Sequence, residues 1–143
     1  MLPINYVIFY GTLMGDPLRR NQLKINDQIK LVGDISLLGS MYELPTCPGF
    51  IPKGERLYQA ELYQILEPKI LDILDSFEEY FPLDKNGSRF LREQIWVSEF
   101  NTYAWIYYLN PKYLPQGSNL IEYISWDLFV TTTRKALPIE LPN

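Results

Sequence analysis

Helical periodicity of any length occurs in only one stretch of this chain, from residue 68 to about residue 80. Elsewhere, short runs of β-branched and aromatic residues alternate with turn signals rich in proline, glycine and asparagine, which is typical of β-strands. Strands and helices do not alternate regularly, so a parallel sheet of repeated β-α units is excluded. The pattern predicts an α+β fold with about six short strands, in a small, mostly antiparallel sheet or barrel, and one main helix.

Several elements can be assigned from local sequence. Residues 6–10 are apolar and aromatic and end at Gly11, as in a buried strand. Asp16-Pro17 has the signature of a helix start, so a short helix is expected over residues 18–23. The remaining predictions are one or two strands over residues 28–42, a proline-rich loop over residues 44–52, strands over residues 57–65, 92–100 and 102–109 with Asn101 in the turn between the last two, and a short helix over residues 120–129.

The chain has 143 residues, and 47% of them are hydrophobic, which is enough for one compact core. Residues 1–143 are therefore expected to form a single domain, with a frayed tail from about residue 131. Lys and Arg total 13 and Asp and Glu total 17, which gives a net charge of −4. The basic cluster of Arg19-Arg20 with Lys24 is expected to be an ordinary solvated face, and the acidic balance argues against nucleic acid as a partner.

The chain contains no histidine. This excludes Ser-His-Asp and Cys-His catalysis and every histidine-based zinc site. The single Cys47 has no histidine to activate it and no second cysteine to bridge, so we expect a small apolar loop residue there. The glycine patterns that bind dinucleotides and nucleotide phosphates are also absent. An enzyme of this sequence has to use carboxylates, Tyr, Lys, hydroxyls or backbone amides, and we expect it to be metal-independent.

Residues 1–5 lack the basic region of a signal peptide. No small-residue cleavage site follows a long apolar stretch, and no apolar run approaches the roughly 20 residues that a membrane helix needs. We therefore expect a cytoplasmic protein without membrane contact.

One carboxylate interrupts the apolar face of the predicted helix. At about 100° per residue, the apolar sector comprises Ile70, Leu71, Ile73, Leu74, Phe77, Tyr80 and Phe81, and the opposite, solvated sector comprises Asp72, Asp75, Ser76 and Glu79. Glu78 falls inside the apolar sector. Burial there would raise its pKa into the range that suits general acid–base catalysis. Alternatively, Glu78 reaches solvent at the rim or pairs with an arginine such as Arg92.

Two segments carry a more specific signal. Residues 7–13, Val-Ile-Phe-Tyr-Gly-Thr-Leu, resemble the YGTL signature that opens gamma-glutamylcyclotransferase-like proteins. Residues 74–78, Leu-Asp-Ser-Phe-Glu, resemble the LDxFE segment that ends on the catalytic Glu of that family. Weaker similarities follow in the family's order over residues 39–44, 48–52, 59–63, 90–92 and 104–108, so the resemblance covers about residues 6–110. It is closest to the gamma-glutamylamine cyclotransferase-like branch, and it selects the same Glu as the helical periodicity.

The resemblance implies a transferase without a cofactor that releases 5-oxoproline from a gamma-glutamyl amine or amino-acid derivative, its small-molecule partner. In this reaction the substrate's own alpha-amine attacks its gamma-carbonyl, and Glu78 would be the general acid/base. The backbone amides of Gly11, Thr12 and Leu13, together with Tyr10, would form the substrate-binding turn. The alternative is a non-catalytic relative of the same fold that binds a small anion or metabolite.

The chain departs from the family pattern at a few positions. The family usually has glycine where this chain has Glu79, and it commonly has tyrosine where this chain has Phe90. Its Gly-Asp-Trp near the end is matched most nearly by residues 125–127. Tyr107 and Tyr108 alternate faces on a predicted strand, so one of them is expected to point inward and pack in the core, with a contact to substrate as the alternative.

Overall fold

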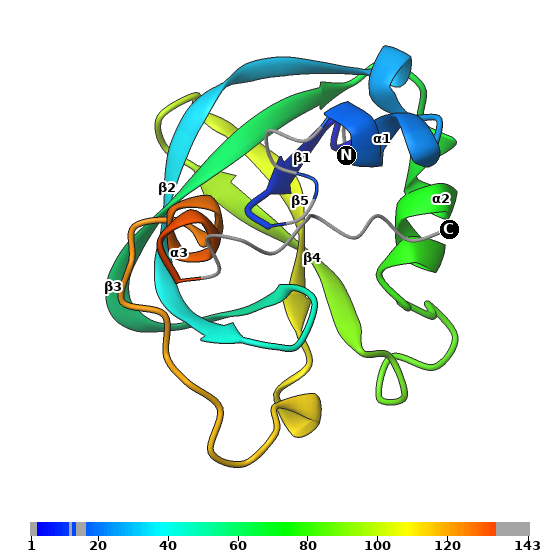
Figure 1. The fold of residues 1–143 in the computed structure, drawn as a ribbon. Helices are drawn as coiled ribbons and strands as arrows, with labels where there is room; N and C mark the ends of the chain where they lie inside the picture. The colour runs from blue at the N-terminus through cyan, green and yellow to red at the C-terminus, as the bar shows by residue number, and fades with distance from the viewer. Residues whose placement is uncertain (1–2, 12, 14–16, 134–143) are drawn as a thin grey trace.

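The computed structural model describes residues 3–11, 13 and 17–133. Within this part of the chain, the elements in order are β1 (Tyr6–Phe9), α1 (Pro17–Gln22), η1 (Asn26–Gln28), β2 (Ile29–Glu43), β3 (Pro48–Ile65), α2 (Ile70–Phe77), β4 (Phe90–Val97), β5 (Thr102–Leu109), η2 (Pro111–Tyr113) and α3 (Trp126–Thr133) (Figure 1). The predicted α+β fold is confirmed. None of the three described α-helices has the length and apolar character needed to cross a lipid bilayer.

The five described strands form one sheet in the order β2-β3-β1-β5-β4. All neighbouring pairs are antiparallel except β1 and β5, which are parallel and meet where Val7 pairs with Trp105. The sheet is open, with β2 and β4 at its edges, so the predicted sheet is confirmed and the barrel alternative is wrong. Asn101 has a φ of 52° in the predicted turn between β4 and β5.

β2 and β3 form one long hairpin where we expected shorter strands separated by a loop. A register shift leaves residues 52–55 of β3 as a bulge without paired residues on β2, and only the Lys53 carbonyl among the described contacts of this segment accepts from β2, from the Ser40 hydroxyl at 2.7 Å. Gly54 in this bulge has a φ of 136°, which residues with a side chain rarely adopt. The prediction of a loop over residues 44–52 is wrong beyond residue 47, because Pro48 starts the strand and Pro52 lies in the bulge, where neither interrupts the ladder.

Strand β1 is buried on both faces and separates two hydrophobic cores. Val7 and Phe9 point into the core that includes the buried face of α2, whereas Ile8 and Tyr10 point into the core that includes α3. Figure 1 shows α2 and α3 on opposite sides of β1 and β5. The alternation follows from the side-chain period of two along a strand, and it explains why β1 has no polar face.

The main helix is shorter than its periodicity predicts, and α3 is shifted from its predicted place. α2 ends at Phe77, so the helical wheel no longer applies to Phe81, whose side chain is 50% exposed. α3 begins at Trp126, six residues after the start predicted from the sequence, because Leu120 pairs with Tyr42 in a β-bridge instead. Similarly, β4 ends at Val97, before the predicted end of its strand.

Candidate active site

A cavity of about 220 Å³ lies between the end of β1 and the end of α2. Tyr10, Gly11 and Leu13 line it from the turn after β1, and Glu78 lines it from the end of α2. The structure thus brings four of the five sequence-predicted site residues to one cavity. The fifth, Thr12, lies outside the described residues.

The β2–β3 hairpin approaches the cavity wall so closely at Gly11 that only glycine fits there. A Cβ atom on Gly11 would lie 2.6 Å from Cγ and 2.8 Å from Cδ of Pro48, which are distances that non-bonded carbon atoms do not tolerate. The proline ring is stiff and starts β3, so it cannot easily move aside. Glycine therefore lets the hairpin tip, with Thr46 and Cys47, close one side of the cavity.

A buried arginine fixes the turn after β1. We predicted an ordinary solvated face at Arg20, and that prediction is wrong, because the residue is only 8% exposed. Its Nη1 donates to the Leu13 carbonyl at 2.8 Å and to the Tyr63 hydroxyl at 2.9 Å, and its Nε donates to Asn26 Oδ1 at 3.1 Å. The guanidinium carbon also lies 5.2 Å from the centre of the Tyr63 ring. Arg20 thereby ties α1 to the cavity wall.

Helix α2 is followed by a Schellman motif with Glu78 as its C-cap. The N–H of Glu79 donates to the Ser76 carbonyl at 3.2 Å, and the N–H of Tyr80 donates to the Asp75 carbonyl at 2.8 Å. Glu79 has a φ of 54°, the left-handed conformation that this motif requires and that glycine adopts without strain. The motif accounts for the glycine that is usual at this position in proteins with the LDxFE segment. It leaves Glu78 facing the cavity, with Glu79 exposed beside it.

Burial raises the pKa of Glu78 to about 8. The Arg89 guanidinium opposes this rise and the Glu79 carboxylate adds to it. The expected alternative of a pair between Glu78 and Arg92 is wrong, because Arg92 contacts Asp75 instead. A carboxyl group with a pKa near neutrality can both accept and return a proton, as general acid–base catalysis requires.

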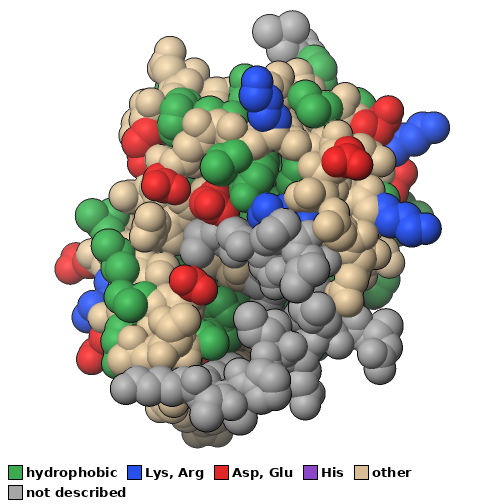
Figure 2. Space-filling view, turned by 45° about the horizontal axis from the view of Figure 1, so that its top comes forward, with side chains coloured by type: hydrophobic (Ala, Val, Ile, Leu, Met, Phe, Trp, Pro, Cys, Tyr) green, Lys and Arg blue, Asp and Glu red, His purple; other side chains and the backbone are tan. Residues whose placement is uncertain are grey.

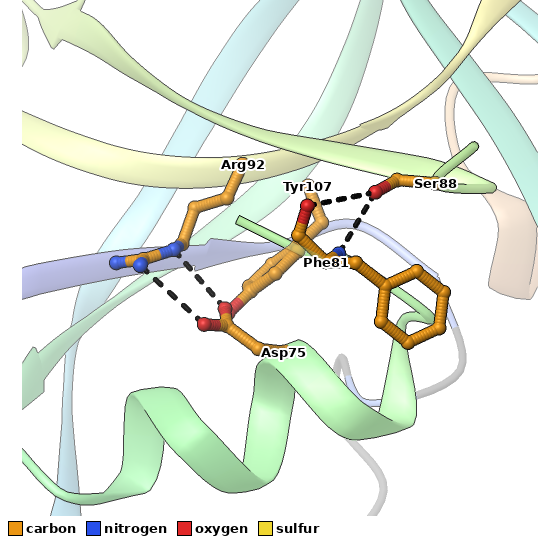
Figure 3. A network of polar contacts seen from close by, with 5 residues as sticks. All are labelled: Asp75, Phe81, Ser88, Arg92 and Tyr107. Carbon is orange, nitrogen blue, oxygen red and sulfur yellow. Dashed lines mark hydrogen bonds and ion pairs between the residues drawn. The ribbon is translucent and has the colours of Figure 1, made fainter. Parts of the chain in front are cut away.

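Asp75 is buried behind the cavity wall, although the helical wheel places it among the solvated residues. It is 8% exposed, and the Tyr107 hydroxyl donates to its Oδ1 at 2.5 Å. Arg92 Nε lies 3.0 Å from the same Oδ1, and Arg92 Nη2 donates to Oδ2 at 3.4 Å (Figure 3). Burial raises the pKa of Asp75, whereas the hydrogen bond from Tyr107 and the charge of Arg92 lower it. Asp75 lies at the edge of the polar sector, where β4 and β5 cover it, and periodicity alone cannot show that.

The same network fixes the two tyrosines in the cavity wall. Tyr107 is the inward residue of the predicted pair, with 3% exposure, and Tyr108 is partly exposed. The Tyr10 hydroxyl donates to the Tyr107 carbonyl at 2.5 Å, so it links β1 to β5. Burial raises the pKa of both Tyr10 and Tyr107, so both hydroxyls stay protonated near neutral pH. Tyr10 and Tyr107 therefore form a rigid wall whose hydroxyl groups are already bonded within the protein.

Among the described residues that line the cavity, Arg89 is the one cation. Its Nη1 lies 3.5 Å from Glu79 Oε2, and both side chains are partly exposed. Sequence reasoning missed Arg89, since a single arginine next to a predicted turn carries no distinguishing pattern. On the face that Figure 2 shows, acidic and basic side chains are interspersed. Within the described chain, no three side chains of the Cys, Asp and Glu type gather as metal ligands.

Solved structures of three other proteins share this fold. The YtfP protein of Escherichia coli is 25% identical, with a TM-score of 0.63 over 85% of this chain and 95% of that chain. An AIG2-like protein from Mus musculus is 19% identical, with a TM-score of 0.62 over 88% and 90%. An uncharacterized protein from Pyrococcus horikoshii is 17% identical, with a TM-score of 0.64 over 92% and 98%. No curated protein sequence matches the chain.

The family model for gamma-glutamyl cyclotransferase, AIG2-like, matches residues 7–128. The match begins in β1 and ends in α3, so it includes both segments that meet at the cavity. It also covers most of the chain. The protein therefore belongs to the AIG2-like gamma-glutamyl cyclotransferase family.

Proposed function

We propose that the protein is a cyclotransferase that releases 5-oxoproline from a gamma-glutamyl amine or amino-acid derivative, with Glu78 as general acid/base. The observation that carries this proposal is the position of Glu78. Glu78 lines the same cavity as Gly11 and Leu13, and burial raises its pKa to about 8. Membership of the cyclotransferase family supports the same reaction.

The reaction is an intramolecular aminolysis, so the substrate supplies its own nucleophile and proximity provides much of the rate. Glu78 takes a proton from the alpha-ammonium, and the freed nitrogen attacks the gamma-carbonyl carbon. A carbon–nitrogen bond forms to close the five-membered lactam, and the bond to the leaving nitrogen breaks. Of the three ammonium protons, one stays on the lactam nitrogen and Glu78 carries the other two in turn to the leaving nitrogen. The atoms balance without water, metal or redox partner.

The charge that develops on the gamma-carbonyl oxygen needs hydrogen-bond donors. The turn after β1 is suited to supply them, because Gly11 has no side chain to obstruct its backbone and Arg20 holds the Leu13 carbonyl in place. We propose that amides of the 11–13 turn stabilise this oxygen or hold the alpha-carboxylate. The rigid rings of Tyr10 and Tyr107 then shape the walls around the glutamyl chain.

The test is turnover of gamma-glutamyl compounds by the purified protein, with 5-oxoproline as the readout. Glu78→Gln keeps size and hydrogen bonding but cannot take up a proton, so it should lose about 10²–10⁴-fold in kcat. Glu93→Gln is the matched control, since Glu93 is an exposed carboxylate on β4 outside the cavity. Activity should survive a chelator, because the mechanism uses no metal ion.

The outcome also decides between enzyme and binding protein. Release of 5-oxoproline by wild type and by Glu93→Gln, but not by Glu78→Gln, supports the proposal. Binding of gamma-glutamyl compounds without any 5-oxoproline would show a non-catalytic relative. Equal turnover by wild type and Glu78→Gln would refute the role of this residue.

A further inference from the structure

The cavity beside Glu78 is small for a ligand-binding pocket. Its volume is about 220 Å³, whereas pockets that enclose a whole drug-sized ligand measure roughly 300–1,000 Å³. Both reacting groups, the alpha-amine and the gamma-carbonyl, belong to the glutamyl part of the substrate and have to reach Glu78. The leaving group must therefore lie toward the opening, where the side chains of Glu79 and Arg89 are 57% and 38% exposed.

The backbone that carries Arg89 is held firmly on both sides. The Ser88 carbonyl accepts from Asn110 Nδ2 at 2.9 Å, and the Arg89 carbonyl accepts from the Asn110 N–H at 2.9 Å. The Arg89 N–H donates to the Glu79 carbonyl at 3.1 Å. Ser88 itself is fully buried and binds the loop before it through its hydroxyl, which accepts from the Phe81 N–H at 2.8 Å (Figure 3). The guanidinium thus extends from a fixed point at the cavity opening.

The side chain of Arg89 is held more loosely than its backbone, by Glu79 and by the Phe90 ring, whose centre lies 5.6 Å from the guanidinium carbon. Its contact with Glu79 is 3.5 Å long and solvent-accessible, and ion pairs of that kind contribute little to stability. A carboxylate on a ligand can displace Glu79 at small cost and can bind the guanidinium through two parallel hydrogen bonds. A neutral ligand group has no such means of replacing Glu79.

Glu79 occupies a backbone position that disfavours it. Its φ of 54° suits glycine, and a residue with a side chain is strained there. Strain that persists at the edge of a cavity points to a role for the side chain. The contact that this side chain makes is the one with Arg89.

We propose that Arg89 is a specificity-determining residue that selects gamma-glutamyl compounds whose leaving group carries a carboxylate beside the scissile amide. Glu79 holds the guanidinium at the opening until the leaving-group carboxylate takes its place. This inference rests on the proposed function. It goes further because it specifies the charge of the leaving group and the residue that binds this charge.

Two probes test the inference, gamma-glutamyl-L-alanine and gamma-glutamyl-L-alaninamide, which differ in the leaving-group carboxylate. Wild type should convert the acid with a kcat/KM roughly 10–100-fold above that of the amide. Arg89→Gln should lose most of this ratio, and Arg89→Lys should keep part of it, because lysine retains the charge but not the paired donors. Glu79→Gln should raise the ratio by freeing Arg89. The matched control is Lys85→Gln, which removes an exposed charge from the neighbouring turn and should keep the wild-type ratio.

The two proposals fail in different ways. Equal ratios in wild type and Arg89→Gln, with 5-oxoproline released from both probes, would overturn the inference and leave the proposed function standing. Absence of 5-oxoproline from both probes with wild type would overturn both. If Arg89→Gln does not fold, the affinities of the two probes for the Glu78→Gln protein are measured by calorimetry instead. Equal affinity for acid and amide there overturns the inference, and tighter binding of the acid supports it.

Discussion

Glu78 and Glu79 are neighbours in sequence, yet their backbones differ, with a φ of −87° at Glu78 and of 54° at Glu79. The change occurs within the Schellman motif that ends α2. It turns one carboxylate into the cavity and leaves the other at the opening, beside Arg89. Two residues of the same type thus have different surroundings, because Glu78 is the C-cap of the helix and Glu79 is the left-handed residue that follows it.

The strain at position 79 predicts that glycine is the more stable residue there. Glu79→Gly should raise the free energy of unfolding by about 0.5–1 kcal/mol, since it relieves the left-handed conformation and loses only an exposed ion pair. Glu79→Ala loses the same ion pair but keeps the strain, so it should not be stabilised. Urea unfolding of the three proteins measures the difference. A Glu79→Gly variant that is no more stable than Glu79→Ala would contradict the assignment of strain.

Activity should depend on the ionisation of Glu78. The free enzyme must carry the carboxylate to accept a proton, so kcat/KM should rise with pH along a limb with an apparent pKa of about 8. Arg89 lowers the pKa of Glu78, and Arg89→Gln should therefore move this limb to higher pH. Initial rates measured from about pH 4 to pH 10 give both curves. A limb near the ordinary value of 4.5 would mean that the group titrating in activity is not a buried carboxyl.

The same group predicts a pH dependence of stability. Between the ordinary pKa of 4.5 and the folded value of about 8, the folded protein keeps a proton on Glu78 that the unfolded chain has lost. The contribution of Glu78 to stability is therefore present below 4.5 and is lost as the pH rises to 8, by up to about 1.4 kcal/mol per pH unit. Glu78→Gln lacks this loss, so its stability relative to wild type should increase across that range and then level off. Wild type and Glu93→Gln should follow the same curve, and a constant gap between wild type and Glu78→Gln would contradict the prediction.

The contacts of Asp75 predict a ranking of two substitutions. Arg92→Met leaves a buried carboxylate without its counter-charge and should reduce the free energy of unfolding by about 3 kcal/mol. Tyr107→Phe removes one hydrogen bond to the same carboxylate and should cost about 1–2 kcal/mol. The double variant Asp75→Asn with Arg92→Met should recover part of the first loss. If Tyr107→Phe proves the more damaging change in denaturant unfolding, Arg92 is not the main partner of Asp75.

The approach of Pro48 to Gly11 predicts a clash that a second substitution relieves. Gly11→Ala would place its Cβ 2.6 Å from Pro48 Cγ, and overpacking of this kind costs about 1–3 kcal/mol. It should also reduce turnover, because the hairpin tip and the turn after β1 move apart. Adding Pro48→Ala removes the ring and should restore part of both losses. Absence of any rescue in melting temperature and turnover would show that Pro48 is not the obstacle.

Periodicity and motifs predicted the α+β class, the helix and its exceptional carboxylate, because each of these depends on local pattern. The prolines of residues 44–52 predicted a loop where the β2–β3 hairpin lies. Sequence cannot show that Pro48 starts a strand and that Pro52 lies in a bulge. The helix end was missed because Glu79 adopts a conformation that only glycine would have signalled.

The burial of Arg20 and Asp75 was also missed, and for a different reason. A helical wheel gives the direction of a side chain but not what packs against it. The partners of Asp75 come from β4 and β5, and one partner of Arg20 is Tyr63 on β3. Polar residues that are buried through distant partners leave no local signal, and they became visible only in the assembled fold.

The central place of β1 has a consequence for how the protein forms. Tyr6 pairs with Gln64, and Val7 pairs with Trp105. The partners of β1 are therefore synthesised long after β1 itself. Such long-range pairings slow folding, because closing the long loop costs chain entropy before the stabilising contacts between the strands can form. During synthesis, an apolar strand with no polar face stays without its β5 neighbour until most of the chain has left the ribosome. The cavity should therefore appear in one late step, and fragments that end before β5 should aggregate rather than show partial activity.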